Sequence, residues 1–182
     1  LDGTDCLMLS GESAIGKYPE EAVTMLAGIA AVTEPQRPAM RLKLLREMGQ
    51  PPSPPITPAE AMASVVEHAL ETVPSAAVIV PTRTGTTARL ISRFKPPVWI
   101  AAFSPDHGVC QSLVFSWGVH PVELAQDPED WRAFAREWLR EHRVPGDDAL
   151  LVADPSPRHP EANHRIEFLR LGAVRGSASN GR

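Results

Sequence analysis

A loop rich in hydroxyl groups, near the middle of the chain, is the clearest candidate for chemistry. The apolar run 78–80 and Pro81 lead into a segment with four hydroxyls, one cation and one glycine: Thr82, Arg83, Thr84, Gly85, Thr86 and Thr87. A helix is predicted to begin within this segment, so its first backbone N–H groups have no intrahelical partner. Hydroxyls, N–H groups and a guanidinium suit an anion, and glycine lets the backbone approach it closely. The sequence therefore predicts a phosphate-binding loop at 82–87.

A second interpretation of this loop stays open. A helix cap that binds no ligand would use the same residue types, but it needs only one hydroxyl. Four hydroxyls favour the phosphate site. The loop is not a Walker loop, because the GxxxxGK[ST] spacing and its lysine are absent.

The opening segment contains a second candidate site. The pattern predicts a buried strand at 6–9, then a loop of small residues, then a helix that starts near Pro19. Ligands of α/β proteins gather at the carboxyl ends of strands, which places Ser10 and Glu12 among the candidate site residues. The alternative is a turn closed by local hydroxyl hydrogen bonds.

The other reactive residue types favour structural roles. The six histidines show no HxxxH or HExxH spacing, and neither cysteine has a second cysteine two to four residues away, so we expect no metal site. Cys110 is expected to pack as a small hydrophobic residue. The aromatic residues from Trp131 to Trp138 are expected in the core or in a subunit interface.

Proline marks where the elements that position these residues begin. The chain has 19 prolines in 182 residues, about twice the usual share. Pro19 and Pro58 each stand at a first helical position, and Thr57 and Glu60 form a capping box around the second. Helices are predicted at 19–33, 40–48, 57–73, 86–94, 105–117 and from 127 onward, and strands at 76–80, 98–103, 119–124, 149–153 and 166–171. Apolar strands that alternate with helices predict an α/β fold with three layers, a mostly parallel sheet covered on both faces.

Composition narrows the class of protein. With 18 Lys+Arg against 22 Asp+Glu, the net charge is −4, and we expect neither nucleic acid nor a membrane surface as partner. The longest apolar stretch, 22–32, is shorter than the roughly 20 residues of a membrane span. No signal peptide is evident, and two distant cysteines suit a reducing compartment, so a cytoplasmic protein is expected. The first residue is Leu1 rather than Met, which predicts a partial or trimmed chain.

Several stretches resemble the C-terminal part of pyruvate kinase. The segment LDGTDCLMLSGESAIGKYPEEAV is closely similar to the last barrel strand, loop and helix of that family. The loop TRTGTTA with the following LISRFKPP resembles its phosphate-holding effector loop and next helix. The stretches WIAAFS and SWGVHPV resemble its next strand and the turn beyond. The similarity is clear over residues 1–124 and weaker afterwards.

The resemblance implies a division of the chain. Residues 1–49 would be the end of a (β/α)8 catalytic barrel with connecting helices, 50–56 a proline-rich linker, 57–175 the regulatory α/β domain and 176–182 a flexible tail. The family transfers a phosphoryl group from phosphoenolpyruvate to ADP with Mg2+ and K+, as a homotetramer. Its catalytic lysine, metal ligands and K+ ligands lie on earlier strands. The chain alone is therefore expected to bind neither ion and to be inactive, with Ser10 and Glu12 as peripheral residues beside the active site.

Two departures from the family pattern concern regulation. Gln111 stands where many members have Arg. Near the end, the glycine-rich effector loop of the family is replaced by residues 153–163, which lack glycine and add Asp154 and Glu161. Because these acids would repel a second phosphate, a monophosphate at 82–87, or no effector, is expected rather than fructose 1,6-bisphosphate.

Three functional hypotheses follow. The first is the regulatory and assembly portion of a pyruvate kinase, which works with a missing N-terminal barrel. The alternative is a free-standing α/β module that binds anions or sugar phosphates without kinase activity. The third is an interaction domain in which the aromatic helix, or the helix from Pro105, forms a homo-oligomer interface.

Overall fold

The computed structural model describes residues 4–36, 56–153 and 163–171. The chain divides into two compact units, Leu1–Gly49 and Gln50–Arg182, and each is considered by itself. Four predictions lie wholly or mostly outside the described residues: the helix at 40–48, the linker at 50–56, the altered loop at 153–163 and the tail at 176–182.

The first unit is helical where it is described. Its elements are α1 (Gly11–Ala14), α2 (Pro19–Thr33) and the 3-10 turn η1 (Glu34–Gln36). The predicted helix at 19–33 is confirmed, with proline in its first turn and two glutamates beside it. These acids suit the positive end of the helix dipole.

The strand predicted at 6–9 is wrong. These residues form no strand, and Leu7 and Met8 are 62% and 90% exposed. A β-strand needs a neighbouring strand to complete its hydrogen-bond ladder. The described residues of this unit, 4–36, contain no second strand that could pair with it.

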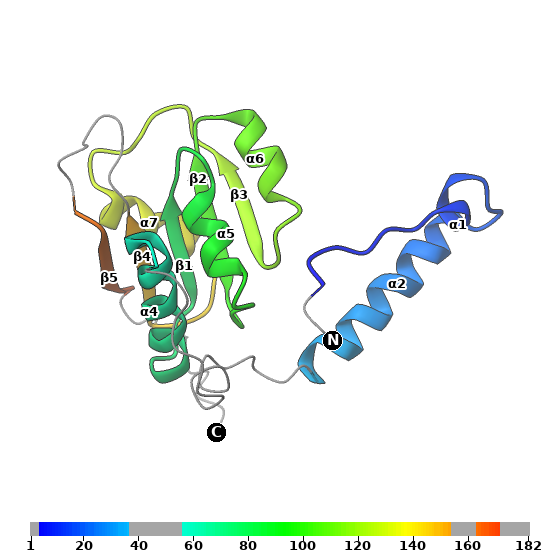
Figure 1. The fold of residues 1–182 in the computed structure, drawn as a ribbon, viewed down its shortest axis with the longest axis horizontal. Helices are drawn as coiled ribbons and strands as arrows, with labels where there is room; N and C mark the ends of the chain where they lie inside the picture. Colours follow the sequence, from blue (N-terminus) through cyan, green and yellow to red (C-terminus); the bar gives the residue numbers. More distant parts are fainter. Residues whose placement is uncertain (1–3, 37–55, 154–162, 172–182) are drawn as a thin grey trace, which may run out of the picture. The chain divides into compact units, whose positions relative to one another are not determined.

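The second unit is built on one five-stranded sheet with the order β3-β2-β1-β4-β5 (Figure 1). The strands are β1 (Ala77–Pro81), β2 (Trp99–Ser104), β3 (Val119–Glu123), β4 (Asp148–Ala153) and β5 (Arg165–Arg170). Strands β1 to β4 run parallel, and β5 pairs antiparallel with β4. The predicted α/β class with a mostly parallel sheet is confirmed.

Helices cover both faces of this sheet. They are α4 (Pro58–Thr72), α5 (Thr86–Ser92), α6 (His107–Leu113) and α7 (Trp131–Glu141). Side chains of α4, α5 and α6 share a core with Val78 and Val80 of β1, whereas α7 packs with Ala77 and Ile79 on the opposite face. This alternation along β1 is the period of two that a strand buried on both faces requires.

Caps set the starts of the helices. Thr57 and Glu60 form the predicted capping box of α4: the Glu60 carboxylate accepts the Thr57 N–H at 2.8 Å, and the Thr57 hydroxyl accepts the Glu60 N–H at 3.3 Å. The hydrogen bond from the Thr57 N–H lowers the pKa of Glu60. Val65 fits the helical spacing of apolar residues 62, 66 and 69, yet it is 55% exposed.

Helix α6 is shorter than the predicted 105–117. Asp106 caps it by accepting the Val109 N–H at 3.0 Å, so the helix begins only at His107. At its other end the Ser116 N–H donates to the Leu113 carbonyl at 2.9 Å, a tighter turn that ends the α-helical ladder. Gly118, with φ of 63°, then turns the chain into β3.

The aromatic residues of α7 belong to the core of the second unit. Phe103 of β2 lies 5.2–5.8 Å, between ring centroids, from Trp131, Phe134 and Trp138. Cys110 is also buried, as predicted, and burial raises the pKa of its thiol. The predicted packing of Cys110 is confirmed, and the aromatic residues of α7 pack against the core, one of the two places predicted for them.

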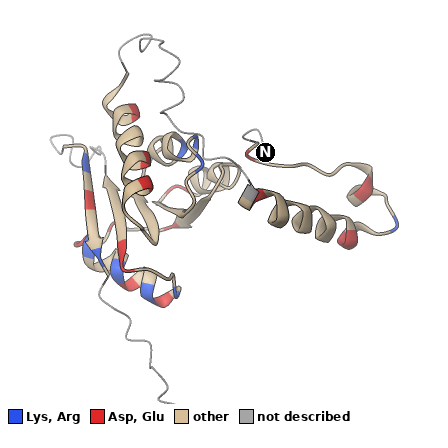
Figure 2. Ribbon diagram, turned by 90° about the horizontal axis from the view of Figure 1, so that it is seen from below, with Lys and Arg blue, Asp and Glu red and all other residues tan. Residues whose placement is uncertain are grey.

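Charged residues of both signs are interspersed along the chain (Figure 2). Two ion pairs bind the edge strand β5 to its neighbours: Arg132 of α7 contacts Glu167 at 2.5 Å, and Arg170 contacts Asp148 of β4 at 2.9 Å. The hydrogen bond from Arg132 lowers the pKa of Glu167. The positive charges of these two arginines are therefore balanced by carboxylates of the second unit.

Candidate functional site at the carboxyl edge of the sheet

The hydroxyl-rich loop lies at the carboxyl end of β1, the central strand. The Thr82 N–H donates to the Phe103 carbonyl of β2 at 2.8 Å, which fixes the first residue of the loop to the sheet. The Gly85 N–H donates to the Thr82 hydroxyl oxygen at 2.9 Å and closes the loop. Gly85 then caps α5 in the left-handed region, with φ of 77°. The sheet edge and one internal hydrogen bond thus hold the loop in place.

Three of the four threonines gather on this loop. The Thr84 and Thr86 hydroxyls lie 2.9 Å apart, and the Thr86 N–H donates to the Thr84 hydroxyl oxygen at 3.4 Å. Thr87, by contrast, is only 4% exposed within α5. The structure brings Thr82, Thr84 and Thr86 together with Gly85 and turns Thr87 toward the protein interior.

Arg83 is paired with an acid from another loop. Its Nη2 donates to Oδ2 of Asp127, which lies between β3 and α7. The two side chains are partly exposed, 27% for Arg83 and 35% for Asp127. The cation predicted for phosphate binding therefore already has a carboxylate partner at the carboxyl edge of the sheet.

Arg89 of α5 connects the loop to helix α6 through hydrogen bonds. Its Nη1 donates to the Thr84 carbonyl at 2.9 Å, and its Nη2 donates to the Ser112 hydroxyl of α6 at 2.7 Å. Two donors of one guanidinium thus join the loop to the neighbouring helix. Arg93, which is close to these residues in sequence, instead stacks on Phe94 with its Cζ 4.7 Å from the ring centroid.

Three partners of the loop come from residues whose role the sequence pattern does not indicate: Asp127, Arg89 and Ser112. The pattern predicts that the next helix begins at Asp127, but α7 begins at Trp131 and its cap is Asp130, which accepts the Arg132 N–H at 2.7 Å. Two acids three residues apart both had the features of a cap. Asp130 caps α7, and Asp127, which does not, pairs with Arg83.

Gly85→Ala tests how tightly the loop is fixed. A Cβ at this position would lie 2.9 Å from the Arg89 Nη1 and 3.0 Å from the Leu113 Cδ2, and the residue has positive φ. The left-handed conformation alone costs a non-glycine residue about 1–2 kcal/mol. We expect the free energy of unfolding of the second unit to fall by at least about 1–2 kcal/mol, and its urea midpoint to fall with it. Gly28→Ala in α2, where a Cβ meets nothing within 4 Å, is the control and should not lower it. Equal midpoints for Gly85→Ala and the unchanged chain would contradict a fixed loop.

Ser10 and Glu12 lie in the first unit, around the start of α1. The Ser10 N–H donates to the Glu12 carboxylate at 3.0 Å, and the Ser13 hydroxyl donates to the Ser10 carbonyl at 3.4 Å. Hydrogen bonds from the backbone N–H groups of Glu12 itself and of Ser10 lower the pKa of Glu12. This local turn keeps the carboxylate ionised, and both residues are exposed.

Among residues 4–36, 56–153 and 163–171, no three His, Cys, Asp or Glu side chains come together in a group that could hold a metal ion. The expectation that this chain alone binds neither Mg2+ nor K+ stays a prediction.

No helix in the described part of the chain is both long enough and apolar enough to cross a bilayer.

The fold and the loop define the class of protein: an α/β domain with a hydroxyl-rich loop at the carboxyl end of its central parallel strand. The family model "Pyruvate kinase, alpha/beta domain" matches residues 60–162. The chain belongs to the pyruvate kinase family, and its second unit contains the C-terminal α/β domain of that family. The resemblance found in the sequence is confirmed.

Relatives and solved structures agree with this assignment. A pyruvate kinase of Thermococcus litoralis is 49% identical over 121 residues, 66% of this chain and 26% of that protein. One of Lactococcus lactis is 37% identical over 182 residues, 96% of this chain and 34% of that protein. A crystal structure of a Cryptosporidium parvum pyruvate kinase has a TM-score of 0.78 and 26% identity, covering 94% of this chain and 34% of that one. The chain spans about a quarter to a third of the length of these relatives.

Proposed function

We propose that this chain is the regulatory and assembly portion of a pyruvate kinase, and that its second unit binds a phosphorylated small molecule at residues 82–87. The observation that carries the proposal is the cluster of Thr82, Thr84, Thr86 and Arg83 at the carboxyl end of β1, inside the region that matches the family. Ligands of open α/β sheets bind outside the carboxyl ends of strands, near the point where the strand order reverses. β1 lies at that point in the order β3-β2-β1-β4-β5.

The loop offers a phosphate several donors. The Thr82 hydroxyl accepts the Gly85 N–H, so its own proton can point to a ligand oxygen. A phosphate oxygen can also take over the hydrogen bond between the Thr84 and Thr86 hydroxyls. A bound effector regulates only if it binds one conformation of the whole enzyme better than another.

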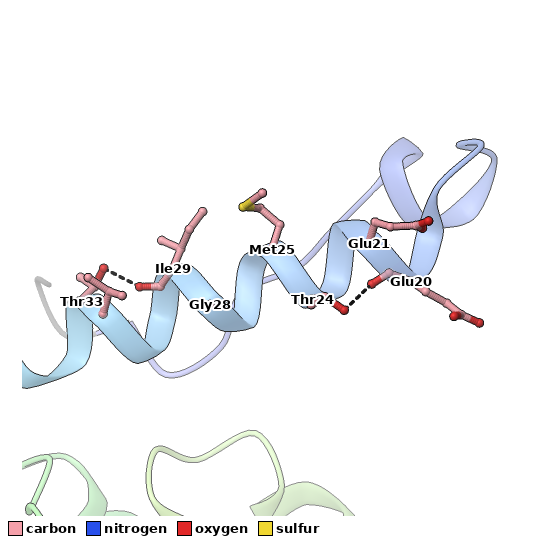
Figure 3. A pocket seen from close by; sticks show the side chains of 8 residues that line it. Glu20, Glu21, Thr24, Met25, Gly28, Ile29 and Thr33 are labelled. Atoms are coloured by element: carbon pink, nitrogen blue, oxygen red, sulfur yellow. Dashed lines mark hydrogen bonds between the residues drawn. The ribbon is translucent and has the colours of Figure 1, made fainter.

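The first unit supports a role in assembly. Side chains of α2 line an open pocket, and Figure 3 shows that Met25 and Ile29 project to the same side of this helix. Met25, Ile29 and Val32 are 67%, 55% and 66% exposed. Three large apolar side chains on one helix favour burial against another body, each with a gain of about 1.5–3 kcal/mol. The partner in this proposal is the rest of a pyruvate kinase barrel.

The chemistry of the whole enzyme is part of the same proposal. The complete protein would transfer a phosphoryl group from phosphoenolpyruvate to ADP, with Mg2+ and K+, as a cytoplasmic homotetramer. Ser10 and Glu12 would lie beside its active site. The catalytic lysine and the metal ligands would come from outside these 182 residues, so the chain would not catalyse the reaction alone.

A coupled assay tests this division of labour. The purified 182-residue chain is mixed with phosphoenolpyruvate, ADP, Mg2+ and K+, and pyruvate is followed through lactate dehydrogenase and NADH. We expect no turnover above the blank, while a complete pyruvate kinase in parallel shows that the assay works. The proposal would be overturned if the chain shows turnover and the variant Ser10→Ala or Glu12→Gln reduces it. The chain would then carry its own active site.

A further inference from the structure

The ion pair between Arg83 and Asp127 joins two loops that are far apart in sequence. Arg83 follows β1 and Asp127 follows β3, 44 residues later, and β2 lies between these strands in the sheet. Each loop also has local hydrogen bonds that do not involve this pair. The 82–87 loop is closed by Thr82 and Gly85, and α7 is capped by Asp130.

The charges around the loop indicate that an anion bound there would contact Arg83. Arg89, the other cation at the loop, already donates to the Thr84 carbonyl and to Ser112. Within the described part of the chain, Arg83 instead pairs with a carboxylate, and a carboxylate resembles a phosphate in offering oxygen atoms to a guanidinium. A phosphate that binds both Nη groups of Arg83 in a bidentate pair must therefore take Nη2 from Asp127.

We infer that Asp127 is an internal competitor of the ligand and sets which anions the loop accepts. The inference rests on the proposed phosphate site. A phosphate dianion offers Arg83 more charge and more acceptor oxygens than Asp127 does, so it can displace the carboxylate. A monocarboxylate offers no advantage over Asp127. The pair therefore selects phosphate over carboxylate ligands and keeps Arg83 neutralised when no ligand is bound.

Phosphate titrations of the 182-residue chain test the competition. Inorganic phosphate is added at constant ionic strength, and the backbone amide resonances of Gly85 and Thr86 are followed by NMR. Asp127→Asn should bind phosphate about two- to fivefold more tightly, the size expected for a partly exposed ion pair. Glu129→Gln removes one negative charge from the same loop and is the matched control, with little change expected. Acetate should bind Asp127→Asn measurably and the unchanged chain much more weakly.

The double variant separates competition from general repulsion. In an Arg83→Ala background, the gain from Asp127→Asn should fall to that of Glu129→Gln, because no cation remains to compete for. A gain of equal size in both backgrounds would overturn the inference, and so would equal phosphate affinity of Asp127→Asn and the unchanged chain; in either case the phosphate site itself would stand. If phosphate binds none of these chains, the proposed site and the inference both fail. Circular dichroism melting checks that every variant is folded.

Discussion

Phe103→Ala should lower the free energy of unfolding of the second unit by about 3–5 kcal/mol. Phe103 is 2% exposed, and its ring contacts Trp131, Phe134 and Trp138 of α7. Removal of the ring loses its transfer free energy and leaves a cavity between the sheet and α7. Because single domains are stable by only about 5–15 kcal/mol, the loss is a large share of the total.

Urea unfolding followed by tryptophan fluorescence measures this loss. All four tryptophans of the chain lie in the second unit, so the signal reports on that unit alone. Phe168→Ala is the matched control: Phe168 is 53% exposed on β5, and its truncation should cost less than about 1 kcal/mol. If Phe103→Ala does not fold, Phe103→Leu gives a smaller measurable loss. A loss below about 1 kcal/mol for Phe103→Ala would show that α7 does not depend on this ring.

Arg83→Ala should weaken the binding of inorganic phosphate about tenfold. A charge-assisted hydrogen bond contributes about 1.5–3 kcal/mol when one partner is removed. The lower end applies here, since Arg83 is partly exposed and must first leave Asp127. The hydroxyls of Thr82, Thr84 and Thr86 remain, so weak binding should persist. The measurement is the same amide titration at Gly85 and Thr86.

Arg93→Ala is the matched control for this variant. Arg93 follows the last residue of α5, where it stacks on Phe94 and its Nη1 lies 3.9 Å from the Glu60 Oε1. The variant therefore removes one cation near α5 without changing the loop. Its phosphate affinity should stay within about twofold of the unchanged chain, the size of a screened surface charge. Equal affinities of Arg83→Ala and the unchanged chain would mean that the loop does not use its cation, and the phosphate site would have to rest on the hydroxyls alone.

Local patterns predicted most elements of the second unit. The capping box at Thr57 and Glu60 and the apolar spacing after it predicted α4, because both signals lie within the helix itself. Apolar runs such as 76–80 and 98–103 predicted β1 and β2, since strands buried on both faces need no polar alternation. The ends of α6 and the start of α7 were missed, because several residues there could serve as a cap.

The strand predicted at residues 6–9 shows the limit of such patterns. Its apolar residues resemble a barrel strand, yet in this chain they form none, and Met8 is 90% exposed. A strand is defined by its neighbours, and its own residues cannot supply the second half of a hydrogen-bond ladder. The sequence of a strand therefore predicts a tendency that only a partner strand can complete.

The α/β class, the family and the composition of the loop at 82–87 can be predicted from the sequence, because they depend on residues that are close together in the chain. Which side chains contact one another depends on the fold. It paired Arg83 with Asp127, placed Arg89 between Thr84 and Ser112, and buried Thr87. The physical reason is that strand order brings the carboxyl ends of β1 and β3 to one edge of the sheet, and charges from distant loops neutralise one another there.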